Sequence, residues 1–134
     1  MDAASYKEIA DQVGLSPHAV AERVKRLERK GVIQGYTARV DLQELGRTVS
    51  AYIDVRLQPA TAPETFEKLA FSLPALQHLA FVTGRFDYSI LLACSSTVDL
   101  DETVRELRRR GGVAATETRI VMRAFDRSTM PLPS

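Results

Sequence analysis

Two arginines three residues apart give the chain its clearest chemical signal. Arg23 and Arg26 fall in the segment from Ser16 to Lys30, where this spacing places both on one side of a helix. Arginine can donate paired hydrogen bonds to a guanine edge and can also contact phosphate. Between Pro17 and Arg39, 6 basic residues face 2 acidic ones, which gives a local charge of +4. The segment predicts contact with nucleic acid, although a solvated basic helix in an αα-corner fits the same pattern.

A second group of polar residues, Thr83 to Tyr88 (TGRFDY), joins two apolar segments. Gly84 permits close approach of a ligand to the backbone because it has no side chain. Asp87 can accept a hydrogen bond from a ligand ammonium group, and it can also cap its own turn. The residues by themselves favour the self-capped turn, and a small-molecule site is the alternative.

Neither metal nor cofactor chemistry is predicted. Cys94 is the only cysteine, and the two histidines, His18 and His78, are far apart in the sequence. These positions do not supply a metal-ligand spacing. His78 has no evident acidic partner for general acid–base work. The chain is therefore not expected to be an enzyme.

Composition and charge limit the class of protein further. The chain has 134 residues, 18 Lys plus Arg against 17 Asp plus Glu, and a net charge of +1, which excludes a uniformly basic binder of the histone type. No apolar run is long enough to span a bilayer, and the first residues lack the features of a signal peptide. We expect a soluble cytoplasmic protein that has no membrane partner.

A pair of helices is expected to position the basic segment. Residues 6–13 carry apolar side chains at helical spacing, and Gly14 fits the end of this helix. Ser16 then fits the start of a second helix, whose arginines would face outward. Residues 32–40 predict a short β-wing that carries Arg39. This order of elements predicts a winged helix-turn-helix.

The rest of the chain alternates between strand and helix patterns. A capping box of Thr61 and Glu64 is expected to open the first of its helices. The order βαββαβ predicts a ferredoxin-like antiparallel sheet with both helices on one face, so the expected fold class is α+β. The expected strands are residues 48–57, 76–83, 88–94 and 113–125, and the expected helices are residues 61–73 and 98–110.

The two patterns divide the chain into expected parts. Residues 1–40 form the DNA-binding domain, 41–47 a linker, 48–126 the ferredoxin-like domain and 127–134 a flexible tail. The first strand of the second domain would leave large side chains on the sheet face away from the helices. An open face of this kind tends to pack against a partner, so we expect a homodimer. The side chains concerned are Ser50, Tyr52, Asp54 and Arg56.

Short motifs follow one another in a recognisable order along nearly the whole chain. In the first part they are SYKEIA (5–10), VGLSP (13–17), VAERVKRLE (20–28) and GVIQGY (31–36). In the second part they are VTGRFDY (82–88) and TETRIV (116–121). In this order the chain resembles the Lrp/AsnC regulators, also known as leucine-responsive or feast/famine proteins. The resemblance implies a winged helix-turn-helix joined to an effector-binding, dimerising ferredoxin-like domain that assembles into dimers and often octamers.

The resemblance also implies a transcriptional regulator that binds double-stranded DNA and responds to a small-molecule effector, an amino acid. The hairpin loop would line the effector pocket and face threonines of the last strand. The candidate DNA contacts are Ser5, Ser16, Pro17, His18, Glu22, Arg23, Arg26 and Arg39. The candidate effector contacts are Thr83, Gly84, Arg85, Phe86, Asp87, Tyr88, Thr116 and Thr118.

The chain departs from the family pattern at its start, because family members usually carry a further helix before Ser5. Without that helix, Ile9, Val20 and Leu27 would lack part of their apolar cover. We therefore expect an N-terminally shortened winged helix-turn-helix. The alternative function is a ligand-binding oligomerisation module without autonomous DNA binding. An enzyme similar to the sirohaem decarboxylases is disfavoured, since only two histidines are available.

Overall fold

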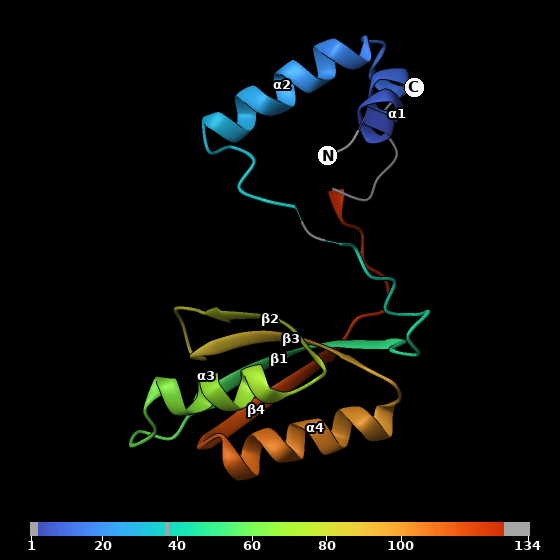
Figure 1. The fold of residues 1–134 in the computed structure, drawn as a ribbon. Coiled ribbons are helices and arrows are strands. Elements are labelled where there is room, and N and C mark those ends of the chain that lie inside the picture. The colour runs from blue at the N-terminus through green and yellow to red at the C-terminus, as the bar shows by residue number, and fades with distance from the viewer. Residues whose placement is uncertain (1–2, 37, 128–134) are drawn as a thin grey trace. The chain divides into compact units, whose positions relative to one another are not determined.

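The computed structural model describes residues 3–36 and 38–127. The chain divides into two compact units, which Figure 1 draws with colour running along the sequence. The first unit holds the described residues up to Val40 together with Phe125–Arg127. The second unit holds Asp41–Ala124.

The first unit is built on two helices, α1 (Ala3–Val13) and α2 (Pro17–Arg29). Gly14 ends α1 with φ at +73°, and its N–H donates to the Ala10 carbonyl at 2.9 Å. Glycine adopts this left-handed conformation without the strain of a side chain. Ala10 and Val20 are the buried apolar residues of the described helix pair. The helix-turn-helix is confirmed, and α1 begins earlier than the predicted residue 6.

The predicted β-wing forms no strand among the described residues of 32–40, a range in which Thr37 is not described. Val32 and Val40 are exposed, so the segment lacks an apolar surface to pack on. A two-stranded hairpin is marginal in water without such packing. Tyr36 instead turns back to α2, where its hydroxyl donates to Glu28 Oε1 at 2.6 Å.

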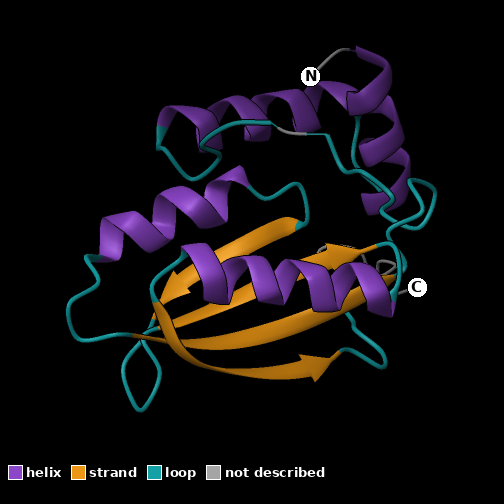
Figure 2. Cartoon of the chain, turned by 90° about the horizontal axis from the view of Figure 1, so that it is seen from below, coloured by secondary structure: helices purple, strands orange, loops and turns teal. Residues whose placement is uncertain are grey.

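The second unit is an antiparallel sheet with two helices. Its elements are β1 (Val49–Leu57), α3 (Pro63–Ser72), β2 (Leu76–Phe81), β3 (Tyr88–Cys94), α4 (Thr97–Arg110) and β4 (Val113–Ile120). The strands lie in the order β2-β3-β1-β4, and every neighbouring pair is antiparallel. Both helices cover the same face of the sheet (Figure 2). This is the predicted βαββαβ arrangement, and the α+β fold class is confirmed.

Alternation along β1 decides which side chains enter the core of the second unit. Ile53 and Val55 are buried, whereas Tyr52, between them, is exposed. The buried pair belongs to one apolar cluster with Phe66 of α3 and Leu107 of α4. The predicted division of the sheet into a covered and an open face is confirmed.

The last strand is shorter than predicted. β4 ends at Ile120, whereas the apolar pattern predicted an end at residue 125. The Val121 N–H still donates to the Ser50 carbonyl at 2.8 Å. In this register Val49, the first residue of β1, lies opposite Met122, so residues 123–125 have no residue of β1 to pair with.

The start of α3 differs from the predicted capping box. Ala62 is the N-cap residue in place of Thr61, and it makes no side-chain hydrogen bond. Thr61 Oγ1 instead donates to the Gly112 carbonyl at 2.8 Å, which satisfies the hydroxyl through a tertiary contact. Pro63 opens the helix, where its missing N–H has no intrahelical partner to lose.

The expected linker, residues 41–47, is an ordered turn that belongs to the second unit. Gly46 has φ at +76°, and the Arg47 N–H donates to the Leu42 carbonyl at 2.8 Å. Arg47 Nη1 also donates to the Ala93 carbonyl at 3.0 Å. These bonds hold the segment against the end of β3, and we call residues 41–47 the connector.

The described residues hold neither a membrane-spanning helix nor a metal-ligand cluster. None of their helices is both long and apolar enough to cross a bilayer. None of their His, Cys, Asp and Glu side chains form a group of three or more that could hold a metal ion. Of the expected tail, residues 127–134, all but Arg127 lie outside the described residues.

Candidate functional site

The N-terminus of α2 is fixed by a side-chain cap. Ser16 Oγ accepts a hydrogen bond from the Ala19 N–H at 3.1 Å, as its sequence position predicted. Pro17 stands in the first turn, where a missing N–H is tolerated. The other N–H groups of this turn and the helix dipole favour a negative charge. The start of α2 can therefore hold a phosphate group.

The exposed face of α2 carries unpaired cations. His18, Glu22, Arg23 and Arg26 are all exposed, and Val20 on the opposite side of the helix is buried. Neither arginine forms an ion pair or a side-chain hydrogen bond with another described residue. The predicted contacts on this helix are thus brought together on one surface, with two guanidinium groups available to a partner.

Glu28, near the end of α2, does not neutralise these arginines. Its carboxylate accepts the hydrogen bond from the Tyr36 hydroxyl. This hydrogen bond is the main reason why the pKa of Tyr36 rises to about 12. Glu28 is thus engaged with Tyr36 and forms no ion pair with Arg23 or Arg26 in the described structure.

Two of the predicted DNA contacts lie away from α2. Arg39 is exposed on the extended segment that takes the place of the predicted wing. Ser5 belongs to α1, but its side chain lies outside the described part of the structure. The side chain of Arg39 is therefore available to a partner on a segment separate from the α2 surface.

The loop between β2 and β3 forms the second candidate site. The Val82 N–H donates to the Asp87 carbonyl at 2.9 Å and closes the loop, so β2 ends at Phe81, two residues before the predicted end. Gly84 has φ at +108°, a conformation that side-chain-bearing residues rarely adopt. Residues 83–85 are exposed at the tip, where a ligand can approach the backbone.

Asp87 is bound to β1 through both its side chain and its backbone. Its Oδ2 accepts from the Leu57 N–H at 2.8 Å, and its own N–H donates to the Val55 carbonyl at 2.8 Å. β3 begins at Tyr88, which pairs with Val55, so the Leu57 N–H lies beyond the end of the strand ladder. Asp87 therefore caps β1 across the sheet and does not cap its own turn. Its second carboxylate oxygen has no partner among the described residues.

Tyr88, also predicted as an effector contact, lies in the core. Its side chain is 1% exposed, and its ring centroid is 4.7 Å from that of Phe66. The hydroxyl donates to Glu67 Oε2 at 2.7 Å. Burial, followed by this hydrogen bond, raises the pKa of Tyr88 well above its ordinary value. The role that the structure supports for Tyr88 is packing beneath the loop.

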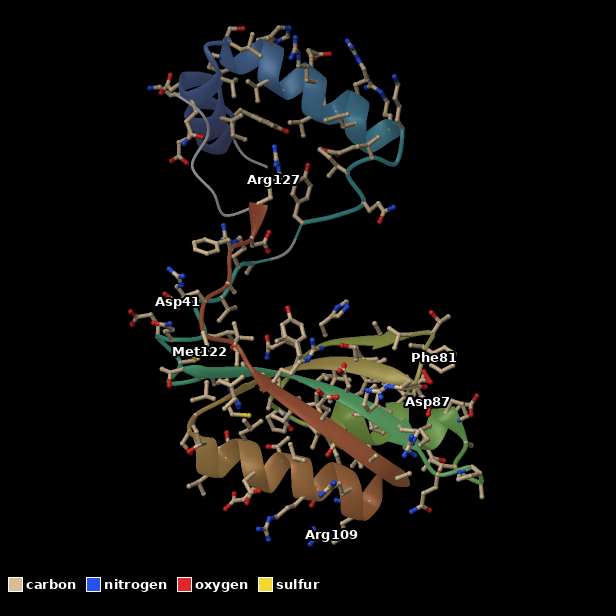
Figure 3. The ribbon with its side chains drawn as sticks, turned by 180° about the vertical axis from the view of Figure 1, so that it is seen from behind. Asp41, Phe81, Asp87, Arg109, Met122 and Arg127 are labelled. Carbon is tan, nitrogen blue, oxygen red and sulfur yellow. The ribbon has the colours of Figure 1, made fainter. Side chains whose placement is uncertain are left out.

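A groove of about 380 Å³ lies beside Asp87. Phe81 and Asp87 lie close together at one end of the sheet, while Asp41 and Met122 lie at the other (Figure 3). Phe81 is 70% exposed and supplies an apolar wall. The groove combines this wall with a carboxylate and a guanidinium, which suit a small molecule that carries both charges. Its lining residues are Arg56–Pro59, Thr61, Pro63, Phe81 and Asp87.

The predicted threonines of the last strand do not join the hairpin within one chain. Thr116 pairs with Val55 and Thr118 pairs with Ile53, so β1 lies between them and β3. Two strand spacings, about 10 Å, separate Thr116 from Tyr88. The threonines and the hairpin groove are therefore separate surfaces of the chain.

Arg56, Gln58 and Phe81 line the groove but were not among the predicted effector contacts. Alternation assigned Arg56 to the open sheet face, but it does not show where a strand ends beside a loop. Phe81 could have been predicted as a groove residue, because it is a large apolar residue next to a predicted turn. Phe86, which was predicted, is half-buried, and the Arg85 guanidinium lies 5.7 Å from its ring centre.

Comparison with protein families places each unit in a known class. Residues 3–34 match the family described as winged helix-turn-helix DNA-binding. Residues 50–131 match the family described as the Lrp/AsnC ligand binding domain. Together the two matches cover most of the chain.

Individual relatives match across both units. The HTH-type transcriptional regulator LrpA of Mycobacterium tuberculosis is 31% identical over 134 residues, which cover 96% of this chain and 86% of LrpA. The feast or famine regulatory protein of M. tuberculosis, solved with L-methionine, has a TM-score of 0.70 at 28% identity and covers 94% of this chain and 85% of its own. The transcriptional regulator NMB0573 of Neisseria meningitidis, solved as a complex with L-Met, has a TM-score of 0.76 at 25% identity and covers 96% and 84%.

Proposed function

The chain belongs to the Lrp/AsnC family of transcriptional regulators, and we propose that it reads operator DNA through α2 and responds to an amino acid bound beside the β2–β3 hairpin. The observation that carries the proposal is the pair of unpaired arginines on the exposed face of a capped helix. Arg23 and Arg26 can form hydrogen bonds with base edges without first giving up other partners. The capped N-terminus, with Ser16, adds a phosphate contact that fixes the position of the helix.

The chemistry of the hairpin groove supports an amino-acid effector. An amino acid needs an acceptor for its ammonium group and donors for its carboxylate. The unpaired oxygen of Asp87 can serve the ammonium group, and Arg56 can serve the carboxylate. Phe81 offers an apolar surface for the ligand side chain. Two of the related structures hold L-methionine, which makes this amino acid the first probe to use.

The open face of the sheet supports a homodimer as the working unit. Tyr52 is 42% exposed there, and the Arg119 guanidinium lies 5.9 Å from its ring centre. Arg119 Nη2 also pairs with Asp54 Oδ1 at 3.2 Å. A second copy would cover these large side chains, and the exposed hairpin tips would join dimers into larger assemblies such as an octamer. The amino acid then acts by binding one assembly state more tightly than another.

Selection from random duplex DNA tests the DNA-binding part of the proposal. The purified chain is incubated with the pool, and enriched sequences are compared with scrambled versions by fluorescence anisotropy at fixed salt. We expect the enriched sequences to bind on the order of a thousandfold tighter or more, the ordinary range for specific binding. The absence of any enrichment would contradict sequence-specific binding by this chain.

One observation favours the second candidate function, a ligand-binding oligomerisation module without autonomous DNA binding. Val13 and Leu27 are exposed on the helix pair, although both belong to its apolar pattern. Exposed apolar side chains weaken a small unit. A failed selection together with intact L-methionine binding by calorimetry would favour this second function.

A further inference from the structure

A second cavity, of about 240 Å³, lies at the opposite end of β3 from the hairpin groove. The connector forms one wall through Leu45 and Arg47, and the first turns of α4 form another through Asp99 and Thr103. The turn between α3 and β2 closes the third side. Because the volume lies below the roughly 300–1,000 Å³ of pockets for drug-sized ligands, its occupant must be small.

Arg47 lines this cavity with a guanidinium group that makes only one of its possible hydrogen bonds in the described structure. The residue is half-buried, and one of its nitrogens, Nη1, donates to the Ala93 carbonyl at 3.0 Å. The other N–H groups of the guanidinium have no partner among the described residues. A guanidinium has five N–H donors, so Arg47 can hold the connector in place and still bind an anion.

Asp99, on the other wall, has a carboxylate of which only one oxygen accepts hydrogen bonds in the described structure. Its Oδ2 accepts from the Ser95 N–H at 2.8 Å and from Ser95 Oγ at 3.2 Å. Its second oxygen, Oδ1, has no partner among the described residues. Asp99 and Arg47 line the same cavity but form no ion pair with each other in the described structure.

Each charge also has a purely structural explanation, since Arg47 anchors the connector and Asp99 helps to cap α4. Neither explanation involves the remaining N–H groups of the Arg47 guanidinium or the Oδ1 atom of Asp99. These unpaired atoms are open to the cavity and not sealed in the core, since no buried side-chain N or O atom of the described residues lacks a partner, so a ligand that enters the cavity can pair with both groups. A molecule that pairs with both must carry an anionic and a cationic group and be small enough for a cavity of about 240 Å³.

We propose that this cavity binds a small zwitterion, namely an α-amino acid with a short aliphatic side chain. Its carboxylate pairs with Arg47, and its ammonium group pairs with Asp99. Leu45 and Leu73 form the apolar surface for its side chain. The site is separate from the hairpin groove, and it does not depend on DNA binding.

The position of this site gives it a consequence for the connector. Leu45 and Arg47 belong to the connector, whereas Asp99 belongs to α4. A ligand that bridges Arg47 and Asp99 adds a second link between the connector and the sheet domain, beside the Arg47 bond to Ala93. Occupancy of the cavity therefore stiffens the segment through which the DNA-binding unit is joined to the rest of the chain.

Calorimetry on the full chain tests the proposal, with L-valine as the probe. Two relatives of valine, isovalerate and isobutylamine, each lack one of its charges and serve as ligand controls. We expect both to bind at least tenfold more weakly than L-valine, because each leaves one charged wall unpaired.

Two substitutions connect the binding to this cavity. Asp99→Asn removes the charge but keeps an oxygen that can accept from Ser95, so the start of α4 remains capped. Arg47→Met removes the guanidinium but keeps much of the stem. Asp101→Asn is the matched control, since Asp101 lies on the exposed side of the same helix and pairs with Arg105. We expect roughly a tenfold or larger loss of L-valine affinity in the first two variants and no change in the control.

The outcomes separate this cavity from the hairpin groove. Unchanged L-valine affinity in Asp99→Asn would overturn the proposal. If Phe81→Ala removed that binding instead, the ligand would occupy the groove, and the proposed effector function would still stand. A wild-type chain that bound no L-valine would also overturn the cavity site, and the DNA selection would remain a separate test of the proposed function.

Discussion

Single side chains differ in how far the fold already uses them. Arg23 and Arg26 have no partner among the described residues, whereas Asp87 is bound to Leu57 and Tyr88 to Glu67. An unpaired cation can bind a new partner without losing a bond, but an engaged group is also part of the fold's stability. Substitutions of Arg23 and Arg26 should therefore change binding alone, whereas substitutions of Asp87 and Tyr88 should also change stability.

Arg23→Ala should weaken binding to the selected operator by about 1–3 kcal/mol while scrambled DNA is bound nearly as before. The reason is that Arg23 stands on the exposed face of α2, where it can reach base edges. Fluorescence anisotropy on both DNAs measures the difference. Arg108→Ala is the matched control, because Arg108 is also an exposed helical arginine that forms no ion pair in the described structure. An equal loss on both DNAs would assign Arg23 to the phosphate backbone.

Arg39→Ala should weaken binding to all sequences alike. Arg39 lies on the extended segment after α2, where it can contact phosphate. The loss of one phosphate contact should lower the slope of log K against log salt by roughly one. Titrations at several salt concentrations give that slope, and a change confined to the operator sequence would contradict the assignment.

Two substitutions at Asp87 separate its two roles. Asp87→Ala leaves the Leu57 N–H without its acceptor and should lower the free energy of unfolding by about 1–3 kcal/mol in urea titrations. Asp87→Asn keeps an acceptor for that N–H and should be closer to wild type in stability. If Asp87 also binds an ammonium group, both variants should lose L-methionine affinity by calorimetry. Full affinity in Asp87→Asn would assign the residue to the fold alone.

At the scale of elements, both partner segments and local signals decide where helices and strands end. β4 stops at Ile120 and cannot reach the predicted residue 125, because Val49 at the start of β1 lies opposite Met122 and β1 has no residue opposite 123–125. The predicted wing lacks an apolar surface to pack against, and its described residues form no strand. α2, by contrast, has local signals at both ends: Ser16 caps its start, and Gly31 follows its end. Elements with local end signals are therefore the ones whose limits the sequence predicts well.

Ser16→Ala tests the local signal at the start of α2. Loss of the bond between Ser16 Oγ and the Ala19 N–H should destabilise the helix by about 0.5–2 kcal/mol. Hydrogen exchange read by mass spectrometry should then be faster in peptides from α2 and unchanged in peptides from β1 and β3. Ser16→Thr keeps the hydroxyl and serves as the control. Equal exchange in wild type and Ser16→Ala would show that packing, not the cap, holds the helix end.

At the scale of the whole molecule, the open face of the sheet is the surface that the helices of the second unit leave uncovered. Tyr52, Asp54 and Arg119 form a contact network on that face, which no helix of the second unit covers. A sheet with one bare face and large side chains on it favours association with a second copy. The proposed regulation depends on such an assembly, because an effector acts through states that differ in affinity.

Tyr52→Asp should convert the assembly into a monomer of 14.9 kDa in light scattering at micromolar concentration. The reason is that the substitution places an additional charge on the proposed contact face, where it would be desolvated on association. Phe71→Asp is the matched control, since Phe71 is an exposed aromatic residue on α3, away from the open face. A wild-type chain that is already monomeric would contradict the proposed dimer.

The sequence by itself determined the features that depend on near neighbours in the chain. Helical spacing and the Ser16 cap predicted α2, and alternation in residues 48–57 predicted which side chains of β1 enter the core. The order of elements predicted the ferredoxin-like sheet, because the order of strands and helices restricts how a chain can pack. The outward arginines, including Arg23, followed from the same spacing.

Only the tertiary structure decided which groups are already engaged and which remain available. The sequence favoured Asp87 as a cap of its own turn. In the structure its carboxylate accepts a hydrogen bond from the Leu57 N–H of β1 instead. The sequence predicted Thr61 as a helix cap. In the structure its hydroxyl donates to the carbonyl of Gly112, which is distant in sequence. Such bonds join residues far apart in the chain, and local patterns do not record them. The physical reason is that a polar group is satisfied by whatever acceptor or donor the fold brings near.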